Sequence, residues 1–220
     1  MSDDRPGAGA DGCRGGWVVV TRTSVSVVGS LQTVVADSTI ASVGVDMPIG
    51  LPDEWWRAAD AEARRFLGGR RASTVFPTPP RPLLQETDHG AANALSRRLF
   101  GRGLPRQSFH LLPRLRELDD LARTQGEDRL LEVHPECSFR ALAGTALPSK
   151  HTLEGRLARQ RLLGPLFGDL IDARPRGAQV DDVLDAFAVL WSVERFLRAE
   201  HIAHGDGARD RYGLRMRIVT

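Results

Sequence analysis

Short valine-rich segments separated by turn residues occupy the first part of the chain. Residues 17–21 (WVVVT) and 25–28 (VSVV) favour strands because β-branched side chains pack well on a pleated sheet. A Gly-Gly pair precedes them, which is typical of a turn. Residues 8–28 therefore predict a meander of three antiparallel strands.

Apolar segments farther along the chain predict further strands and several helices. Residues 40–46 (IASVGVD) and 129–134 (RLLEVH) have the nearly continuous apolar character of buried strands. Residues 180–199 place apolar side chains at the spacing of one helix face. The remaining patterns predict helices at residues 31–37, 53–67, 89–100, 110–124 and 152–171, an irregular proline-rich loop at 70–82 and a last strand at 214–219.

This order of elements predicts an α/β fold with a mixed sheet, in which an antiparallel meander is followed by parallel strands and flanked by helices. The 220 residues are enough for one domain with a full core. We expect residues 8–220 to form this domain, residues 1–7 to be a disordered tail, and residues of about 53–125 to be a helical insertion.

The charge is unevenly distributed, although the net charge is only +2. Twelve arginines and four acidic residues lie between Arg57 and Arg116, so this region carries +8 and the rest of the chain is acidic. Such a region favours a polyanionic partner such as nucleic acid. The alternative is an ordinary charged surface, because arginine is the usual cation of this chain and Lys150 is its single lysine.

Several absences in the sequence limit where the protein is expected to act. No stretch of about 18 apolar residues is present, so we expect no membrane association. The N-terminal residues lack the basic and apolar regions of a signal peptide. The two cysteines, Cys13 and Cys137, are too few for a disulfide framework. We therefore expect a cytoplasmic protein, and the sequence leaves its oligomeric state open.

Carboxylates occupy unusual places in the predicted elements. Asp11 follows the first apolar strand, Asp46 ends a buried strand, and Glu132 lies inside an apolar run. A carboxylate in such surroundings costs several kcal/mol unless it is paired, protonated or bound to metal. On the last predicted helix, Asp182 and Asp185 are three residues apart and share a face.

If that helix packs near the carboxyl ends of the strands, these acids converge and require a cation. Magnesium or manganese would suit a set of hard oxygen ligands made by Asp11, Asp46, Asp182 and Asp185. Each acid also has an ordinary alternative role. Asp182 could stabilise the first turn of its helix, Asp46 could cap a loop, and Glu132 could pair with an arginine.

Other polar residues could hold a phosphate or move a proton. The stiff proline loop offers hydroxyl and guanidinium donors for a phosphate, although it could equally brace helices. Lys150 favours a specific role because arginine is the general cation here, and His134 could shuttle protons, bind metal or be a core histidine. The candidate phosphate-binding residues of the loop are Arg71, Ser73, Thr74, Thr78 and Arg81.

Six motifs lie in order along the chain: GADGCRGGWVVV, VGVDMPIGLP, GRRASTVFPTPPR, LLEVHPECSF, SKHTLEG and DDVLDAFAVLW. Together they resemble a bacterial family of domains of unknown function that are predicted to be RNase H-like nucleases. The resemblance runs from about residue 8 to the C-terminus. It implies an RNase H-like sheet with one acid on the first strand, one on the fourth and a pair on the last helix. In this chain those positions correspond to Asp11, Asp46, Asp182 and Asp185, which would hold the two metal ions of phosphodiester hydrolysis.

The leading hypothesis is therefore a metal-dependent nuclease or phosphoesterase that acts on nucleic acid or on a small phosphate ester. One alternative is a non-catalytic protein that binds anions or nucleic acid on the same fold. Another is an actin-like ATP-dependent phosphotransferase, which normally needs two such domains. The catalytic candidates are Asp11, Asp46, Asp182, Asp185, Glu132, His134 and Lys150.

Overall fold

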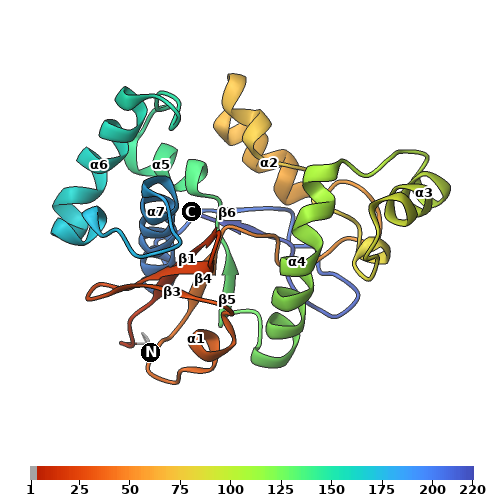
Figure 1. The fold of residues 1–220 in the computed structure, drawn as a ribbon, viewed down its shortest axis with the longest axis horizontal. Helices are drawn as coiled ribbons and strands as arrows, with labels where there is room; N and C mark the ends of the chain where they lie inside the picture. Colours follow the sequence, from red (N-terminus) through yellow and green to blue (C-terminus); the bar gives the residue numbers. More distant parts are fainter. Residues whose placement is uncertain (1–3) are drawn as a thin grey trace.

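The computed structural model describes residues 4–220 and has a five-stranded sheet at its centre (Figure 1). The strand order is β3-β2-β1-β4-β5, with antiparallel pairing among the first three strands along the chain and parallel pairing of β1 with β4 and of β4 with β5. The mixed α/β fold predicted from the sequence is confirmed, and this strand order is compatible with an RNase H-like topology. The strands are β1 (Ala8–Cys13), β2 (Gly16–Val20), β3 (Val25–Val28), β4 (Val43–Val45) and β5 (Leu130–Glu132).

Helices occupy most of the chain outside this sheet. Between β3 and β5 lie α1 (Gln32–Ala36), α2 (Ala58–Leu67), the 3-10 helices η1 (Gly69–Thr74) and η2 (Arg81–Leu83), α3 (His89–Phe100) and α4 (Arg106–Gln125). After β5 come α5 (Pro135–Ala143), α6 (Leu153–Phe167), the 3-10 helix η3 (Gly168–Asp172) and α7 (Val180–Leu197). Two short strands, β6 (Ala203–His204) and β7 (Ile218–Val219), pair with each other, and Val219 bridges to Val133.

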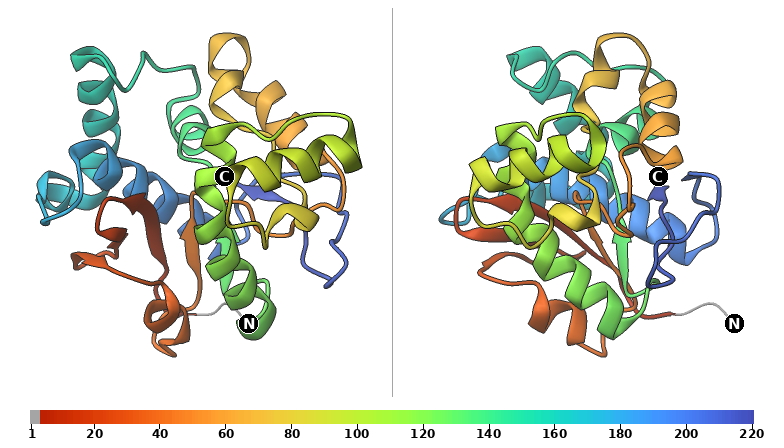
Figure 2. Two further views of the ribbon diagram at one scale, coloured as in Figure 1. Left: turned by 45° about the vertical axis from the view of Figure 1, so that its right-hand side comes forward. Right: turned by 90° about the vertical axis from the view of Figure 1, so that its right-hand side faces the viewer.

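The two faces of the sheet are covered by different helices, because successive strand residues point to opposite sides. Trp17 and Val19 pack with α1 and α4, whereas Val18 and Val20 pack with α6 and α7. Figure 2 shows α4 in front of the sheet and α7 behind it when the molecule is viewed from the side. A residue's place in the strand alternation therefore determines which layer it meets.

Strand β1 and helix α7 approach each other so closely that Gly9 has no room for a side chain. A Cβ at this position would lie 2.2 Å from the carbonyl oxygen of Ala186 and 2.5 Å from the amide nitrogen of Leu190. The helix backbone thus rests directly on the strand. This contact fixes how closely α7 packs against the face of the sheet at β1.

Several expected elements differ in the structure. The proline-rich loop contains η1 and η2, and α5 was not expected after the strand at 129–134. The helix at 152–171 continues through Gly164 and Pro165 to Phe167, and the last strand is reduced to Ile218–Val219. Part of the expected tail, residues 1–3, lies outside the described residues. The Pro6 carbonyl accepts a hydrogen bond from the Ala41 amide, so the chain is already attached to the domain there.

Within residues 4–220, none of the helices combines the length and apolar character needed to cross a membrane.

Candidate active site

Two carboxylates lie side by side at the carboxyl ends of β1 and β4. Asp11 and Asp46 follow Ala10 and Val45, which are partners in the parallel register. Ala10 and Val45 belong to the core under α4, so strand alternation turns both acids toward α7. The Asp46 amide donates to the Ala10 carbonyl at 3.3 Å, and both acids keep part of their surface exposed.

Helix α7 adds a third carboxylate, and the segment before α6 adds a cation. Asp185 is 3% exposed, and Lys150 Nζ donates to its Oδ2 at 2.5 Å. Asp185 Oδ1 is buried and has no hydrogen-bond partner among residues 4–220. A buried acceptor without a partner is costly, so this oxygen is available to a ligand.

Burial raises the pKa of all three carboxyl groups, and neighbouring carboxylates raise it further. Burial raises the pKa of Asp11, and the charges of Asp185 and Asp46 raise it further. Burial also raises the pKa of Asp46, and it raises the pKa of Asp185 to about 6 although Lys150 opposes this shift. Burial would lower the pKa of Lys150, but the three acids raise it above its ordinary value. The site therefore favours positive charge.

The fourth expected ligand, Asp182, stabilises the start of α7. Its Oδ2 accepts a hydrogen bond from the backbone amide of Gln179 at 2.8 Å, as one half of a reciprocal capping arrangement. The structure thus shows the alternative role, a first-turn cap. Asp182 as a metal ligand stays a prediction.

Glu132 belongs to a buried ion network with Arg57 and Asp60, and these three residues line the same cavity as Asp46 and Asp185. Arg57 donates to both of its carboxylate oxygens at 2.7 Å and to Asp60 at 2.6 Å. The Ile49 amide also donates to Glu132 at 2.8 Å. The predicted catalytic role does not fit a carboxylate whose two oxygens are both bonded to the protein. The alternative, pairing with an arginine, is what the structure shows.

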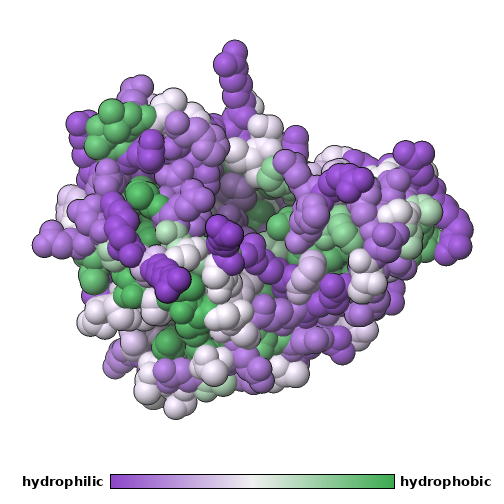
Figure 3. Space-filling view, viewed as in Figure 1, coloured by the Kyte–Doolittle hydropathy of each residue, from purple (hydrophilic) through white to green (hydrophobic). Residues whose placement is uncertain are grey.

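A cavity of about 520 Å³ opens in front of Asp46, Asp185 and Lys150. This volume lies in the range of small-molecule sites. Figure 3 shows the surface hollowed between the side that carries α5 and α6 and the side that carries α4. Asp11 does not line the cavity. Apolar residues form much of the remaining wall, among them Met47, Val75, Phe76, Leu111 and Ile218.

Four of the five candidate phosphate-binding residues line this cavity: Arg71, Ser73, Thr74 and Thr78. Their three hydroxyls already donate within the protein, to the Arg70 carbonyl, the Arg71 carbonyl and Asp60 respectively. Arg71 donates to the Leu147 carbonyl at 3.2 Å and forms no ion pair within the described part of the chain. Arg71 is therefore the donor of this loop best placed for an anionic ligand.

Arg81 is the exception and does not reach the cavity. It is 8% exposed, it donates to both oxygens of Asp119 at 2.7 and 2.8 Å, and it forms a further short ion pair with Asp210. The substrate-binding role predicted for Arg81 is corrected on this ground. A buried guanidinium between two carboxylates holds α4 and the C-terminal segment against η2.

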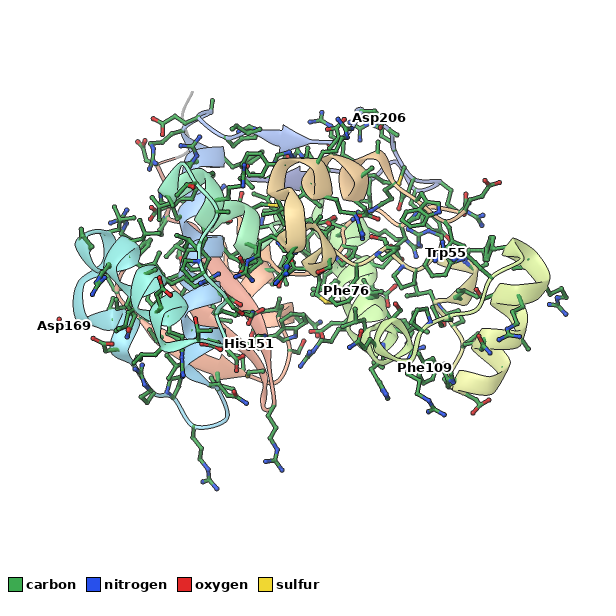
Figure 4. All side chains as sticks on the ribbon, turned by 90° about the horizontal axis from the view of Figure 1, so that it is seen from above. Trp55, Phe76, Phe109, His151, Asp169 and Asp206 are labelled. Atoms are coloured by element: carbon green, nitrogen blue, oxygen red, sulfur yellow. The ribbon has the colours of Figure 1, made fainter. Side chains whose placement is uncertain are left out.

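Three further residues of the cavity lining are His134, Phe76 and His151. His134 lies near Asp46, its Nε2 is 3.3 Å from the Thr74 carbonyl, and its buried Nδ1 has no partner in residues 4–220. Neither Phe76 nor His151 is among the site residues predicted from the sequence. Figure 4 shows both near the middle of the molecule, Phe76 from the segment after α2 and His151 from the segment before α6. A phenylalanine inside a proline-rich loop was the available signal for Phe76.

The donor set fits a divalent cation in its chemistry. Three carboxylates with raised pKa values repel one another, and Asp185 Oδ1 is an unbonded, buried oxygen next to the cavity. Their present spacing is wider than a ligand set requires, since residues 4–220 contain no group of three or more His, Cys, Asp or Glu close enough to hold a metal. Lys150 supplies the positive charge in this arrangement.

One model of a known protein family matches most of the chain. Residues 9–208 match the model described as "Protein of unknown function (DUF429)". The chain belongs to the DUF429 family. The part matched to DUF429 contains Asp11, Asp46, Lys150 and Asp185, and it extends from β1 to the segment after β6. The family description names no function, and neither a curated protein nor a solved structure matches the chain.

Proposed function

We propose that this protein hydrolyses phosphodiester bonds in nucleic acid or in a small phosphate ester, with Mg²⁺ or Mn²⁺ as cofactor. The observation that carries the proposal is the meeting of Asp11 of β1, Asp46 after β4 and Asp185 of α7 beside a cavity that Asp46 and Asp185 line, with Asp185 Oδ1 buried and unbonded among the described residues. Crowded carboxylates cost stability, so acids with raised pKa values in a cavity indicate a functional site. The motif resemblance to predicted RNase H-like nucleases supports the same reaction.

Asp11, Asp46 and Asp185 would hold the metal, which when bound supplies a Lewis acid for the phosphate and lowers the pKa of a water. The Lys150 ammonium would donate to a phosphate oxygen, because it already lies at the carboxylates through its hydrogen bond to Asp185. Arg71 would donate to the same phosphate from the opposite loop. His134 also lines the cavity and has an Nδ1 without a partner among the described residues, which makes it the candidate to carry a proton.

A cleavage screen tests this proposal. Single-stranded DNA, duplex DNA, RNA and bis(4-nitrophenyl) phosphate are each incubated with the protein in Mg²⁺, in Mn²⁺ and in EDTA. We expect hydrolysis of at least one substrate with metal and none with EDTA. Asp46→Asn should lower the rate by about a hundredfold or more, since even the outer partners of metal ligands are worth about 10–100-fold.

Asp169→Asn is the matched control, because this acid is exposed on η3 and lies at the periphery in Figure 4. It should cleave as fast as the wild type. Activity that survives EDTA would exclude the metal mechanism. Binding of phosphate without hydrolysis of any substrate would favour the non-catalytic anion-binding alternative. Lys150, which is paired with Asp185, would supply a cation for the anion in that case too.

A further inference from the structure

Phe76 presents a large apolar ring to the cavity and leaves 52% of its surface exposed. Burying such a ring on folding would stabilise the protein by about 1.5–3 kcal/mol, so its exposure is a cost to the free protein. Leu111 of α4 also lines the cavity, which gives this wall a second apolar side chain. The wall therefore suits a flat apolar group of a ligand.

The segment that carries Phe76 is held on both sides. The Val75 carbonyl accepts from Arg64 Nη1 at 2.8 Å. Two residues after Phe76, the Thr78 amide and hydroxyl donate to buried Asp60 at 3.0 and 3.2 Å. Pro77 lies between Phe76 and Thr78, so this backbone has little freedom to lose when a ligand binds.

The cavity also has charged side chains in its lining. Lys150, His151 and Arg71 line it, next to Asp46 and Asp185. An anionic group of a ligand would be attracted to Lys150 and Arg71, whereas an apolar ring would be attracted to Phe76. The cavity thus combines an exposed aromatic ring with two cationic side chains within about 520 Å³.

We propose that the cavity binds one nucleotide unit at a time, with its base stacked on Phe76 and its phosphate directed to Lys150 and Arg71. This inference rests on the proposed function in taking the carboxylate end as the reacting end. Stacking on an aromatic ring accepts any base, because every base has a π face. A base inside a duplex is already stacked on its neighbours, so the unit must be a free nucleotide or an unpaired nucleotide of a strand.

Calorimetric titration in Mg²⁺ and in EDTA tests the inference with AMP and with ribose 5-phosphate, which lacks the base. We expect AMP to bind about five- to hundredfold more tightly to the wild type, which is the usual value of one stacked base. Phe76→Ala should remove this advantage, and Phe76→Trp should keep it. Tyr212→Ala is the control, because Tyr212 is 51% exposed and lies outside the cavity.

A single-stranded hexanucleotide and a blunt duplex distinguish the two sources of the unit. Binding of the hexanucleotide that depends on Phe76 indicates an unpaired nucleotide of a strand, and Phe76-dependent binding of AMP alone indicates a free nucleotide. Equal affinities for AMP and ribose 5-phosphate, or a duplex bound most tightly without dependence on Phe76, would overturn the inference. Phe76-dependent AMP binding without hydrolysis of any phosphodiester would uphold it and refute the proposed function. Phosphodiester hydrolysis together with AMP binding that does not depend on Phe76 would uphold the proposed function and refute this inference.

Discussion

Asp11 destabilises the metal-free protein when it ionises, because burial and the neighbouring acids raise its pKa. A carboxyl group with a higher pKa in the folded chain holds its proton more tightly there than in the unfolded chain. The free energy of unfolding therefore falls as the pH rises from the ordinary value of 3.8 through the raised pKa of Asp11 in the folded chain.

Asp11→Asn removes the ionisable group, and with it the repulsion that this carboxylate exerts on Asp46 and Asp185. In EDTA at pH 7.5 the variant should melt a few degrees above the wild type, since each kcal/mol corresponds to about 2–4 °C in a chain of this size. The difference should shrink as the pH is lowered to about 4. Thermal melts across this range check it, with Asp169→Asn as control. If Asp11→Asn raised the melting temperature as much at pH 4 as at pH 7.5, the repulsion exerted by the ionised Asp11 carboxylate would not be the cause.

Arg71 and Arg81 should respond differently to the same substitution. Arg81→Ala leaves Asp119 and Asp210 buried without their cation, which should cost about 3–5 kcal/mol in the free energy of unfolding. Arg71→Ala should change that free energy by less than about 1 kcal/mol and weaken phosphate binding by about tenfold. Urea denaturation and calorimetry with AMP separate the two effects. If Arg81→Ala weakened AMP binding without loss of stability, the assignment of Arg81 to the interior would be wrong.

Asp11, Asp46 and Asp185 are predictable from local patterns in the sequence. The ion-pair partners of Glu132 and Arg81 are not. Strand alternation and helix spacing in the sequence alone point to Asp11, Asp46 and Asp185. Glu132 pairs with Arg57 across 75 residues, and Arg81 reaches Asp210 across 129. The sequence shows that such charges need partners, but not which of 29 arginines or which acids provide them.

At the level of the helix, Asp182 and Asp185 should have separable effects. Asp182→Ala removes the first-turn contact of α7 and should cost about 0.3–1 kcal/mol, seen as a lower melting temperature with or without metal. Metal at a hundredfold excess over its Kd stabilises by about 2.7 kcal/mol, and Asp182→Ala should keep this gain. Asp185→Asn should lose most of it. Melts with and without Mn²⁺ measure both, and a lost gain in Asp182→Ala would restore Asp182 as a ligand.

Helices and strands are predictable where the spacing of apolar residues stays regular over the whole element. They are harder to predict where a proline or glycine interrupts that spacing. The alternation in 8–28 and the helical spacing in 180–199 predict β1 to β3 and α7. Helix α5 was missed because Pro135 looked like the end of a strand, although proline also suits the first position of a helix. The short helix η1 forms in the proline loop because Ser73 and Thr74 hydroxyls bond the carbonyls three residues before them.

Considered over the whole molecule, the basic stretch 57–116 offers less free charge than its composition suggests. Arg57 and Arg81 are neutralised in buried ion pairs, and Arg64, Arg114 and Arg116 donate to backbone carbonyls. A site that contacts one phosphate releases few counterions. Between about 50 and 200 mM salt we therefore expect the affinity for a short single strand to fall by less than about tenfold. A loss of about a thousandfold in such a titration would indicate an extended polyanion-binding surface instead.

The close fit of Gly9 under α7 also has a consequence for how the chain folds. Strand β1 is made early in synthesis, but the helix that rests on it is made after almost all the rest of the domain. Until α7 leaves the ribosome, the apolar face of the sheet that α6 and α7 cover together is only partly covered. Contacts between such distant residues slow folding, and an uncovered sheet is prone to aggregation. The nascent chain should therefore depend on chaperones more than a protein with local contacts would.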